Sequence, residues 1–172
     1  MPDVLHASSP PPRLQRRQAL TALALLGAAY GVPRLAFAAA GGAALEVWKD
    51  PSCGCCQDWI DHMQAHGFVA KVHDSGNDAA RARLGLAPQL GSCHTAVVGG
   101  YVVEGHVPAQ DVRRLLAKKP KALGLAVPGM PVGSPGMDGA AYGTRRDPYD
   151  VLLVARDGST QVFSSYHRGP AA

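Results

Sequence analysis

A cluster of thiols constrains this chain more than any other feature. Three of its four cysteines lie in Cys53-Gly54-Cys55-Cys56. An apolar run at residues 45–49 and a turn at Pro51 come before them, which predicts a strand that ends just ahead of the cluster. The next segment has apolar residues at helical spacing: Cys56, Trp59, Ile60 and Met63. At the start of a helix, backbone N–H groups and the helix dipole stabilise a thiolate, so the cluster predicts a chemical site.

The order of the predicted elements indicates the fold class. After the first helix we expect, in order, a strand at 69–73, a helix at 77–84, strands at 95–98 and 101–104, and a helix between Pro108 and Pro120. Asn77 or Asp78 can cap the short helix, and Gly99-Gly100 is a strong signal for a hairpin turn. The resulting β-α-β-α-β-β-α order is that of the thioredoxin-like fold, an α/β class in which the thiol motif follows the first strand.

The last third of the chain changes character. Residues 124–137 are so rich in glycine and proline that we expect no regular element there, only a loop that carries Met130 and Met137. Residues 150–155 and 160–166 then read as two strands around a turn. We therefore expect a Gly/Pro/Met loop and a β-hairpin added to the core sheet.

The fourth cysteine, Cys93, lies far from the others in sequence. In thioredoxin-like proteins the loop that enters the third strand packs against the active-site thiols and usually carries a cis-proline. This chain has Ser92-Cys93-His94-Thr95 there, without a proline. If the topology is correct, Cys93 points at Cys53, Cys55 and Cys56, and four sulfur atoms converge on one surface.

The first 38 residues have the pattern of a cleavable export signal. Arg16-Arg17 precedes a short apolar run at 18–29, and Ala36-Phe37-Ala38 fits a cleavage site near Ala38. Adjacent arginines before a weakly hydrophobic run indicate the twin-arginine route. The run is too short to remain as a membrane span, so we expect a periplasmic protein with no stable membrane insertion after cleavage.

The leader sets the domain boundaries and accounts for most of the charge. We expect a linker at 39–44, one thioredoxin-like metal-binding domain at 45–166 and a disordered tail at 167–172. The chain has 17 basic and 13 acidic residues, a formal net charge of +4. Four of the basic residues and one acidic residue lie in residues 1–38, so the rest carries +1. Such a balance gives no electrostatic reason to expect nucleic acid as a partner.

Four motifs in order resemble one bacterial family. They are KDPSCGCC at 49–56, SCHTA at 92–96, YVVEGHVP at 101–108 and GLAVPGMPVGSPGM at 124–137. The chain is similar in these motifs to a periplasmic family long described as of unknown function, which includes the CopG-type copper-resistance proteins. The resemblance covers nearly all of residues 45–166. It implies a thioredoxin-like fold whose four cysteines bind copper.

The ligand chemistry agrees with a soft metal. Thiolates favour Cu(I), zinc and iron–sulfur centres. Zinc usually takes two separated cysteine pairs, whereas Cys55 directly beside Cys56 is awkward for a mononuclear tetrahedral site. Thiolates that bridge several Cu(I) ions relieve that constraint, so a multinuclear cluster on Cys53, Cys55, Cys56 and Cys93 fits better. The alternative resting state has two disulfides, such as Cys53–Cys56 and Cys55–Cys93.

Nearby histidines and methionines are candidates for secondary ligands. His94 adjoins Cys93 and can add a nitrogen ligand or simply bond to the backbone. His106 reads more readily as a structural histidine. Met130 and Met137 offer thioethers, which are soft donors for Cu(I), although methionine more often fills a core.

Two functions follow from these residues. The first is a copper-binding protein of periplasmic copper resistance, which cycles its redox state or passes copper to other copper-handling proteins; no catalytic residue is assigned in this case. The second is a thiol–disulfide oxidoreductase in which Cys53 attacks and Cys56 resolves. The thiol at Cys93 argues against the second, because it replaces the proline that seats a substrate peptide.

Overall fold

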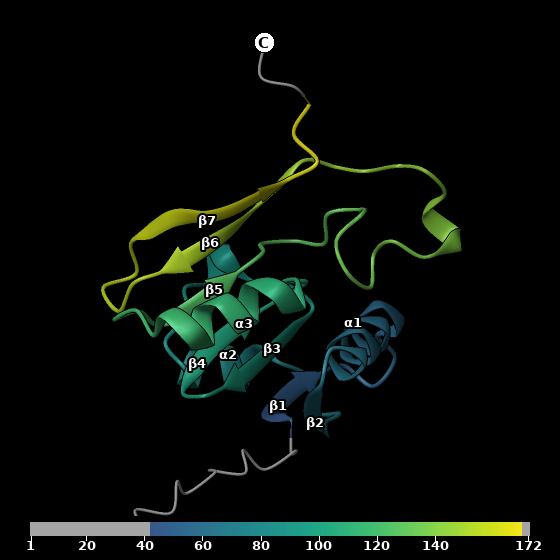
Figure 1. Cartoon of the computed structure of the whole chain (residues 1–172). Coiled ribbons are helices and arrows are strands. Elements are labelled where there is room, and N and C mark those ends of the chain that lie inside the picture. The colour runs from purple at the N-terminus through teal and green to yellow at the C-terminus, as the bar shows by residue number, and fades with distance from the viewer. Residues whose placement is uncertain (1–41, 170–172) are drawn as a thin grey trace, which may run out of the picture. The chain divides into compact units, whose positions relative to one another are not determined.

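The computed structural model describes residues 42–169. Seven strands form one mixed sheet in the order β2-β1-β3-β4-β5-β6-β7 (Figure 1). The strands are β1 (Ala43–Lys49), β2 (Phe68–His73), β3 (His94–Val98), β4 (Tyr101–Glu104), β5 (Gly124–Ala126), β6 (Tyr149–Val154) and β7 (Thr160–Tyr166). The helices are α1 (Gly54–Ala65), α2 (Asp78–Arg83) and α3 (Ala109–Lys118), with short 3-10 turns η1 (Pro88–Leu90) and η2 (Ala140–Tyr142).

The first part of this chain has the thioredoxin-like arrangement that the sequence predicts. β1 pairs in parallel with β2 and antiparallel with β3, and β3 and β4 form the hairpin at Gly99-Gly100. Both turn glycines have positive φ, +55° and +83°, which an L side chain rarely adopts. The predicted elements from the first strand to the last helix are all present, within one to three residues of their expected bounds.

Helices cover the sheet on both faces and enclose two apolar cores. The larger core joins α1 and α3 to the sheet, and its largest buried side chains include Trp59, Ile60, Met63 and Leu115. The smaller core on the other face contains Leu86 and Leu90, from the segment after α2. Trp59 and Met63 are fully buried, as expected from their helical spacing.

The prediction that residues 124–137 hold no regular element is wrong at their start. Gly124–Ala126 forms β5, which pairs in parallel with β4 and antiparallel with β6. A Cβ on Gly124 would lie 1.8 Å from the carbonyl oxygen of Val102, so only glycine permits this approach. A strand of three residues carries too little pattern to be recognised, and its pairing depends entirely on tertiary contacts. Through β5, the predicted hairpin of β6 and β7 joins the core sheet.

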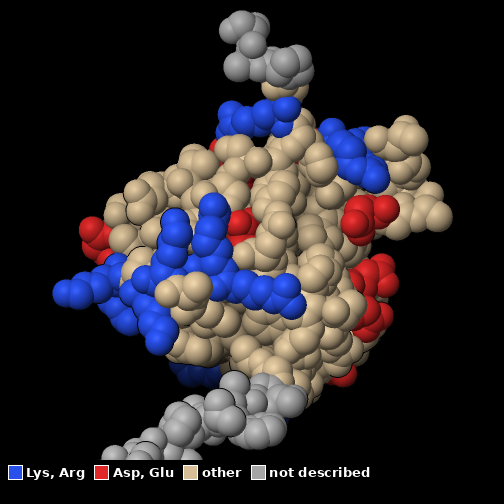
Figure 2. Space-filling model, viewed as in Figure 1, with Lys and Arg blue, Asp and Glu red and all other residues tan. Residues whose placement is uncertain are grey.

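Lys and Arg side chains gather on one part of the surface in Figure 2, around the region where Figure 1 shows α3. α3 and its C-cap contain Arg113, Arg114, Lys118 and Lys119. Cations near the C-terminal end of a helix interact favourably with its dipole. This applies to Lys118 in the last turn and to Lys119 at the C-cap.

The predicted export signal (residues 1–38), the first part of the linker and the end of the tail lie outside the described residues. Within residues 42–169, no helix has the length and apolar character needed to cross a membrane.

The loop after β5 returns over the start of α1. Gly136 has φ +84°, and a Cβ there would lie 2.6 Å from the Cys55 carbonyl oxygen and 2.8 Å from the Trp59 nitrogen. The loop therefore packs against the backbone of the helix that carries the thiols.

Replacing this glycine tests that contact. We expect Gly136→Ala to lower the free energy of unfolding by more than about 1 kcal/mol, because it adds both a clash and a strained φ. Gly139→Ala is the matched control, since Gly139 has negative φ and open space around its Cα. Urea unfolding of both variants measures the difference, and equal midpoints would contradict the packing.

Candidate metal centre

The register of β1 and β3 brings the two parts of the site together. Lys49, the last residue of β1, lies opposite His94, the first residue of β3. The chain leaves β1 through a turn in which the Asp50 carboxylate accepts hydrogen bonds from the Ser52 N–H (2.9 Å) and hydroxyl (2.5 Å). These bonds lower the pKa of Asp50. The turn delivers Cys53 to the N-cap of α1, across from Cys93.

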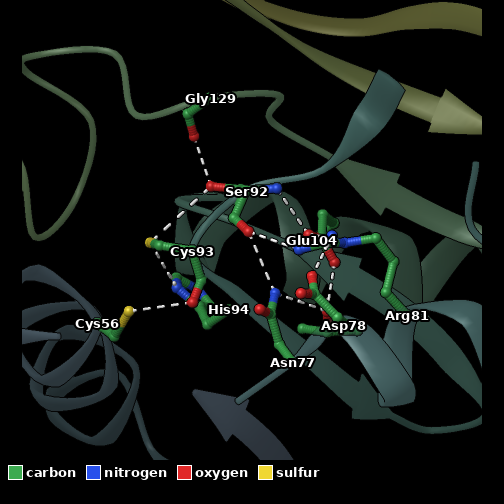
Figure 3. Close-up of polar contacts among 10 residues, drawn as sticks. Cys56, Asn77, Asp78, Arg81, Ser92, Cys93, His94, Glu104 and Gly129 are labelled. Carbon is green, nitrogen blue, oxygen red and sulfur yellow. Dashed lines mark hydrogen bonds and ion pairs between the residues drawn. The ribbon is translucent and has the colours of Figure 1, made fainter. Parts of the chain in front are cut away.

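All four cysteine sulfur atoms lie within 4.8 Å of one another. Cys53 and Cys56 form a disulfide, while Cys55 and Cys93 are free thiols. The Cys55 Sγ lies 3.6 Å from that of Cys53 and 3.9 Å from that of Cys93. The Cys56 Sγ lies 3.4 Å from the Cys93 carbonyl oxygen (Figure 3). The structure thus has one of the two disulfides considered from the sequence, beside two thiols that remain reduced.

Cys93 also belongs to a second group of candidate ligands, together with two histidines. Its Sγ lies 3.1 Å from the His106 Nε2 and 3.4 Å from the His94 Nδ1, and the three side chains form a cluster that could hold a metal. The His106 Nδ1 donates to the Pro135 carbonyl (2.8 Å), which leaves its Nε2 as a lone pair facing the sulfur. The sequence predicted His106 mainly as structural, and the structure adds this direct contact with Cys93.

Burial keeps both histidines neutral. Neither side chain is exposed, and His94 packs against the Trp59 ring at 4.2 Å between centroids. Burial lowers the pKa of His94 well below its usual value, with a further contribution from His106, and burial also lowers the pKa of His106. A neutral imidazole is the form that binds a metal.

The two methionines differ in their surroundings. Met130 is about half exposed (51%) and lines an open groove of about 440 Å³ together with Cys93, Ser92 and Arg81. Met137 is buried, and its sulfur accepts a hydrogen bond from the Tyr142 hydroxyl at 3.3 Å. Met130 is therefore the thioether that solvent can reach from the same groove as Cys93.

Sequence reasoning missed the polar groups behind Cys93. Glu104, the last residue of β4, is fully buried and accepts hydrogen bonds around the Cys93 loop. Burial raises the pKa of Glu104, although its hydrogen bonds and Arg81 act in the opposite direction. Asn77 stands at the N-cap of α2, as predicted, but its side chain makes no capping hydrogen bond. Its amide donates to the Ser92 carbonyl and the Thr95 hydroxyl. In the sequence, the one sign of this hydrogen-bond network was a glutamate at the end of an otherwise apolar strand.

Comparison with known proteins places this chain in a family. Two solved structures, titled "Copper resistance protein copG- Form 2" and "Copper resistance protein copG- Form 1", are each 45% identical to it. Each alignment covers 73% of this chain and 98% of that chain, with TM-scores of 0.68 and 0.67. The chain belongs to the CopG copper-resistance family. A family model described as "Protein of unknown function, DUF411" also matches residues 90–137, and no curated protein matches.

Membership of the CopG family confirms the resemblance inferred from the four motifs. The segment matched by the family model contains Cys93, His94, His106, Met130 and Met137. These are the candidate ligands that lie outside the CxCC cluster, which is formed by Cys53, Cys55 and Cys56. The fold, the sulfur cluster and the family therefore all agree with a copper-resistance protein.

The reactivity of Cys93 should reflect its surroundings. Burial, followed by the negative charge of the Cys55 thiolate, raises its pKa from 9.0 to about 12. In a Cys55→Ser variant with the disulfide intact, we expect iodoacetamide to alkylate Cys93 at least about tenfold more slowly at pH 8 than in the urea-unfolded chain, because only the thiolate reacts. The rate should continue to rise above pH 9. Mass spectrometry follows the alkylation. An alkylation rate that levels off below pH 9 would contradict the raised pKa.

Proposed function

We propose that this chain is a copper-binding protein of copper resistance that holds Cu(I) on the thiolates of Cys53, Cys55, Cys56 and Cys93. The observation that carries the proposal is the convergence of all four sulfur atoms within 4.8 Å. Thiolates are the softest ligands that a protein offers, and they bind Cu(I) as well as zinc and iron–sulfur centres. The two solved relatives are titled as copper resistance proteins, which favours copper over other soft metals.

The sulfur spacing suits shared metal ions. Two thiolates that bind one metal at about 2.3 Å in a near-tetrahedral site lie about 3.8 Å apart. The Cys55 Sγ lies at 3.6 and 3.9 Å from its two sulfur neighbours, so it can bridge an ion on each side. Because Cys55 and Cys56 are adjacent on one helix, bridging of this kind accommodates both, and we propose a multinuclear cluster.

The disulfide must open before all four sulfur atoms can bind. Opening Cys53–Cys56 takes two electrons. A dithiol supplies them together with two protons and becomes a disulfide itself, or two Cu(I) ions supply one electron each and become Cu(II). The second route would link copper binding to a change in copper oxidation state, which is the redox cycling that we propose for this site.

We propose that side chains near Cys93 add secondary ligands to the site. His106 is the best placed, with its Nε2 lone pair 3.1 Å from the sulfur, and His94 follows at 3.4 Å. Met130 would meet copper first, because it lies on the exposed rim of the groove. Met137 is a weaker candidate, since Tyr142 already occupies its sulfur.

We further propose that the protein acts in the periplasm and exchanges copper with other copper-handling proteins there. The support is the pattern of residues 1–38, with its arginine pair, apolar run and cleavage motif. In this proposal the predicted linker, residues 39–44, joins the signal to a metal-binding domain at 45–166, with its last two residues already in β1.

A thiol–disulfide oxidoreductase is the second candidate. The observation in its favour is the Cys53–Cys56 disulfide at the N-terminus of α1. Cys53 is partly exposed and Cys56 is buried, which suits an attacking and a resolving thiol respectively. Against it, the free thiol of Cys55 lies 3.6 Å from the Cys53 sulfur and would compete in every exchange.

Copper titration of the reduced protein without air tests the first proposal. We expect more than one Cu(I) per chain, read by mass and by ultraviolet thiolate charge-transfer bands. Cys53→Ser and Cys93→Ser should lose copper to a similar extent, because each removes one of the four thiolate ligands. Ala65→Ser, at the exposed end of α1, is the control and should bind as the wild type does. Retention of only trace copper by the wild type would overturn the proposal.

Insulin reduction separates the two candidates. We expect no acceleration over dithiothreitol alone, because the Cys93 thiol occupies the position where an oxidoreductase seats its substrate. Rapid turnover that is lost in Cys53→Ser and kept in Cys93→Ser would instead favour the oxidoreductase.

A further inference from the structure

The loop that carries Cys93 has no regular secondary structure of its own before β3 begins at His94. The position of the Cys93 sulfur therefore depends on what holds its neighbours. Ser92 on one side and Thr95 on the other both point polar groups toward a fully buried carboxylate, that of Glu104.

Glu104 accepts three hydrogen bonds from three parts of the chain. Its carboxylate takes the Ser92 N–H at 2.7 Å, the Thr95 hydroxyl at 2.6 Å and the Arg81 Nε at 2.9 Å. Thr95 lies directly opposite Glu104 in the β3–β4 pairing. The carboxylate thus fixes the chain on both sides of Cys93 from a position already set by the sheet.

α2 holds the same loop from the other direction. The Ser92 carbonyl accepts a hydrogen bond from the Arg81 guanidinium at 2.7 Å and one from the Asn77 amide at 3.1 Å. Both peptide groups of the residue before Cys93 are therefore bound, its N–H to Glu104 and its C=O to α2 (Figure 3). The Ser92 hydroxyl adds a hydrogen bond to the Gly129 carbonyl, next to Met130.

Stability alone does not explain this arrangement. Replacing a buried ion pair by apolar groups of similar size is often neutral or stabilising. The Arg81 side chain is only 15% exposed and that of Glu104 is not exposed at all, so the pair carries a desolvation cost. An apolar pair would also leave the Ser92 N–H and the Thr95 hydroxyl without their acceptor, and each unsatisfied donor would carry its own desolvation cost. What the ion pair supplies is therefore the set of hydrogen bonds that hold this loop.

We propose that Glu104 and Arg81 are positioning residues for the thiol site: they hold Ser92 and Thr95 so that the Cys93 sulfur stays within reach of Cys55 and His106. The copper part of this proposal rests on the proposed function, whereas the placement of the thiol does not. A loop displaced by about 1 Å would separate Cys93 from its partners enough to impair a ligand set.

Disulfide trapping measures the placement without copper. Diamide oxidises Cys55 and Cys93 to a disulfide while the Cys53–Cys56 disulfide stays intact; the two thiols lose two protons and two electrons, which diamide takes up. Mass spectrometry after alkylation follows the rate. We expect the double variant Arg81→Met/Glu104→Leu, which leaves no buried charge unpaired, to react at least about fivefold more slowly than the wild type. Its urea midpoint is measured alongside, so that the rates are compared under conditions in which both proteins are folded.

Glu104→Gln provides a second measurement that remains valid if the double variant fails to fold. Removing a negative charge near Cys93 favours its thiolate and would by itself speed oxidation. Loss of positioning slows it, so a slower rate cannot arise from charge alone. Asp78→Asn is the control, because Asp78 binds Arg81 only from the surface, where its side chain is 94% exposed; it should react as the wild type does.

Copper retention is measured on the same proteins after they have been loaded with Cu(I) in the absence of air. We expect the double variant to release Cu(I) to a competing chelator about tenfold faster than the wild type, with weaker thiolate charge-transfer bands. A folded double variant or Glu104→Gln that traps as fast as the wild type overturns the positioning role. If the wild type holds no copper, the copper proposal fails, and the trapping rates still decide whether Glu104 and Arg81 place Cys93.

Discussion

The antiparallel pairing of β1 with β3 is the constraint on which the rest of the site depends. It sets Lys49 opposite His94, so the turn into α1 and the loop into β3 leave the sheet at the same end. A shift of one residue would turn every side chain of β3 to the other face. His94 would then leave the buried position against Trp59, and Cys93 would no longer face the CxCC cluster. The sulfur cluster is in this sense a product of strand register.

Much of this geometry could be predicted from the sequence because it rests on strong local signals. The helical spacing of Trp59, Ile60 and Met63 defines α1, and Gly99-Gly100 defines the β3–β4 hairpin. Once the order of elements indicates the thioredoxin-like fold, the position of Cys93 follows from topology. The predicted convergence of four sulfur atoms is confirmed as geometry, with two of them joined in a disulfide.

The features that the sequence did not predict all depend on tertiary contacts. β5 is recognisable only beside β4 and β6, which supply its hydrogen-bond partners. Asn77 stands at the N-cap of α2 without a capping hydrogen bond, and its amide donates to the Ser92 carbonyl, which the fold brings close to it. Glu104 ends an apolar strand, and nothing in its neighbours along the chain reveals that it binds Ser92 and Thr95. Each of these residues makes its decisive contact with a partner distant in sequence.

β5 also gives the C-terminal third of this chain a structural role, because it covers an edge of the core sheet. In a sheet that stopped at β4, the outer edge of that strand would present unpaired N–H and C=O groups, the kind of edge to which other chains add strands. β5 covers this edge with three residues, and β6 and β7 extend the sheet beyond it. The β4 edge of the sheet that places Cys93 is therefore covered by segments that follow β4 in the chain. A fragment that ended after α3 would carry all four cysteines and would still leave this edge open to strands of other chains.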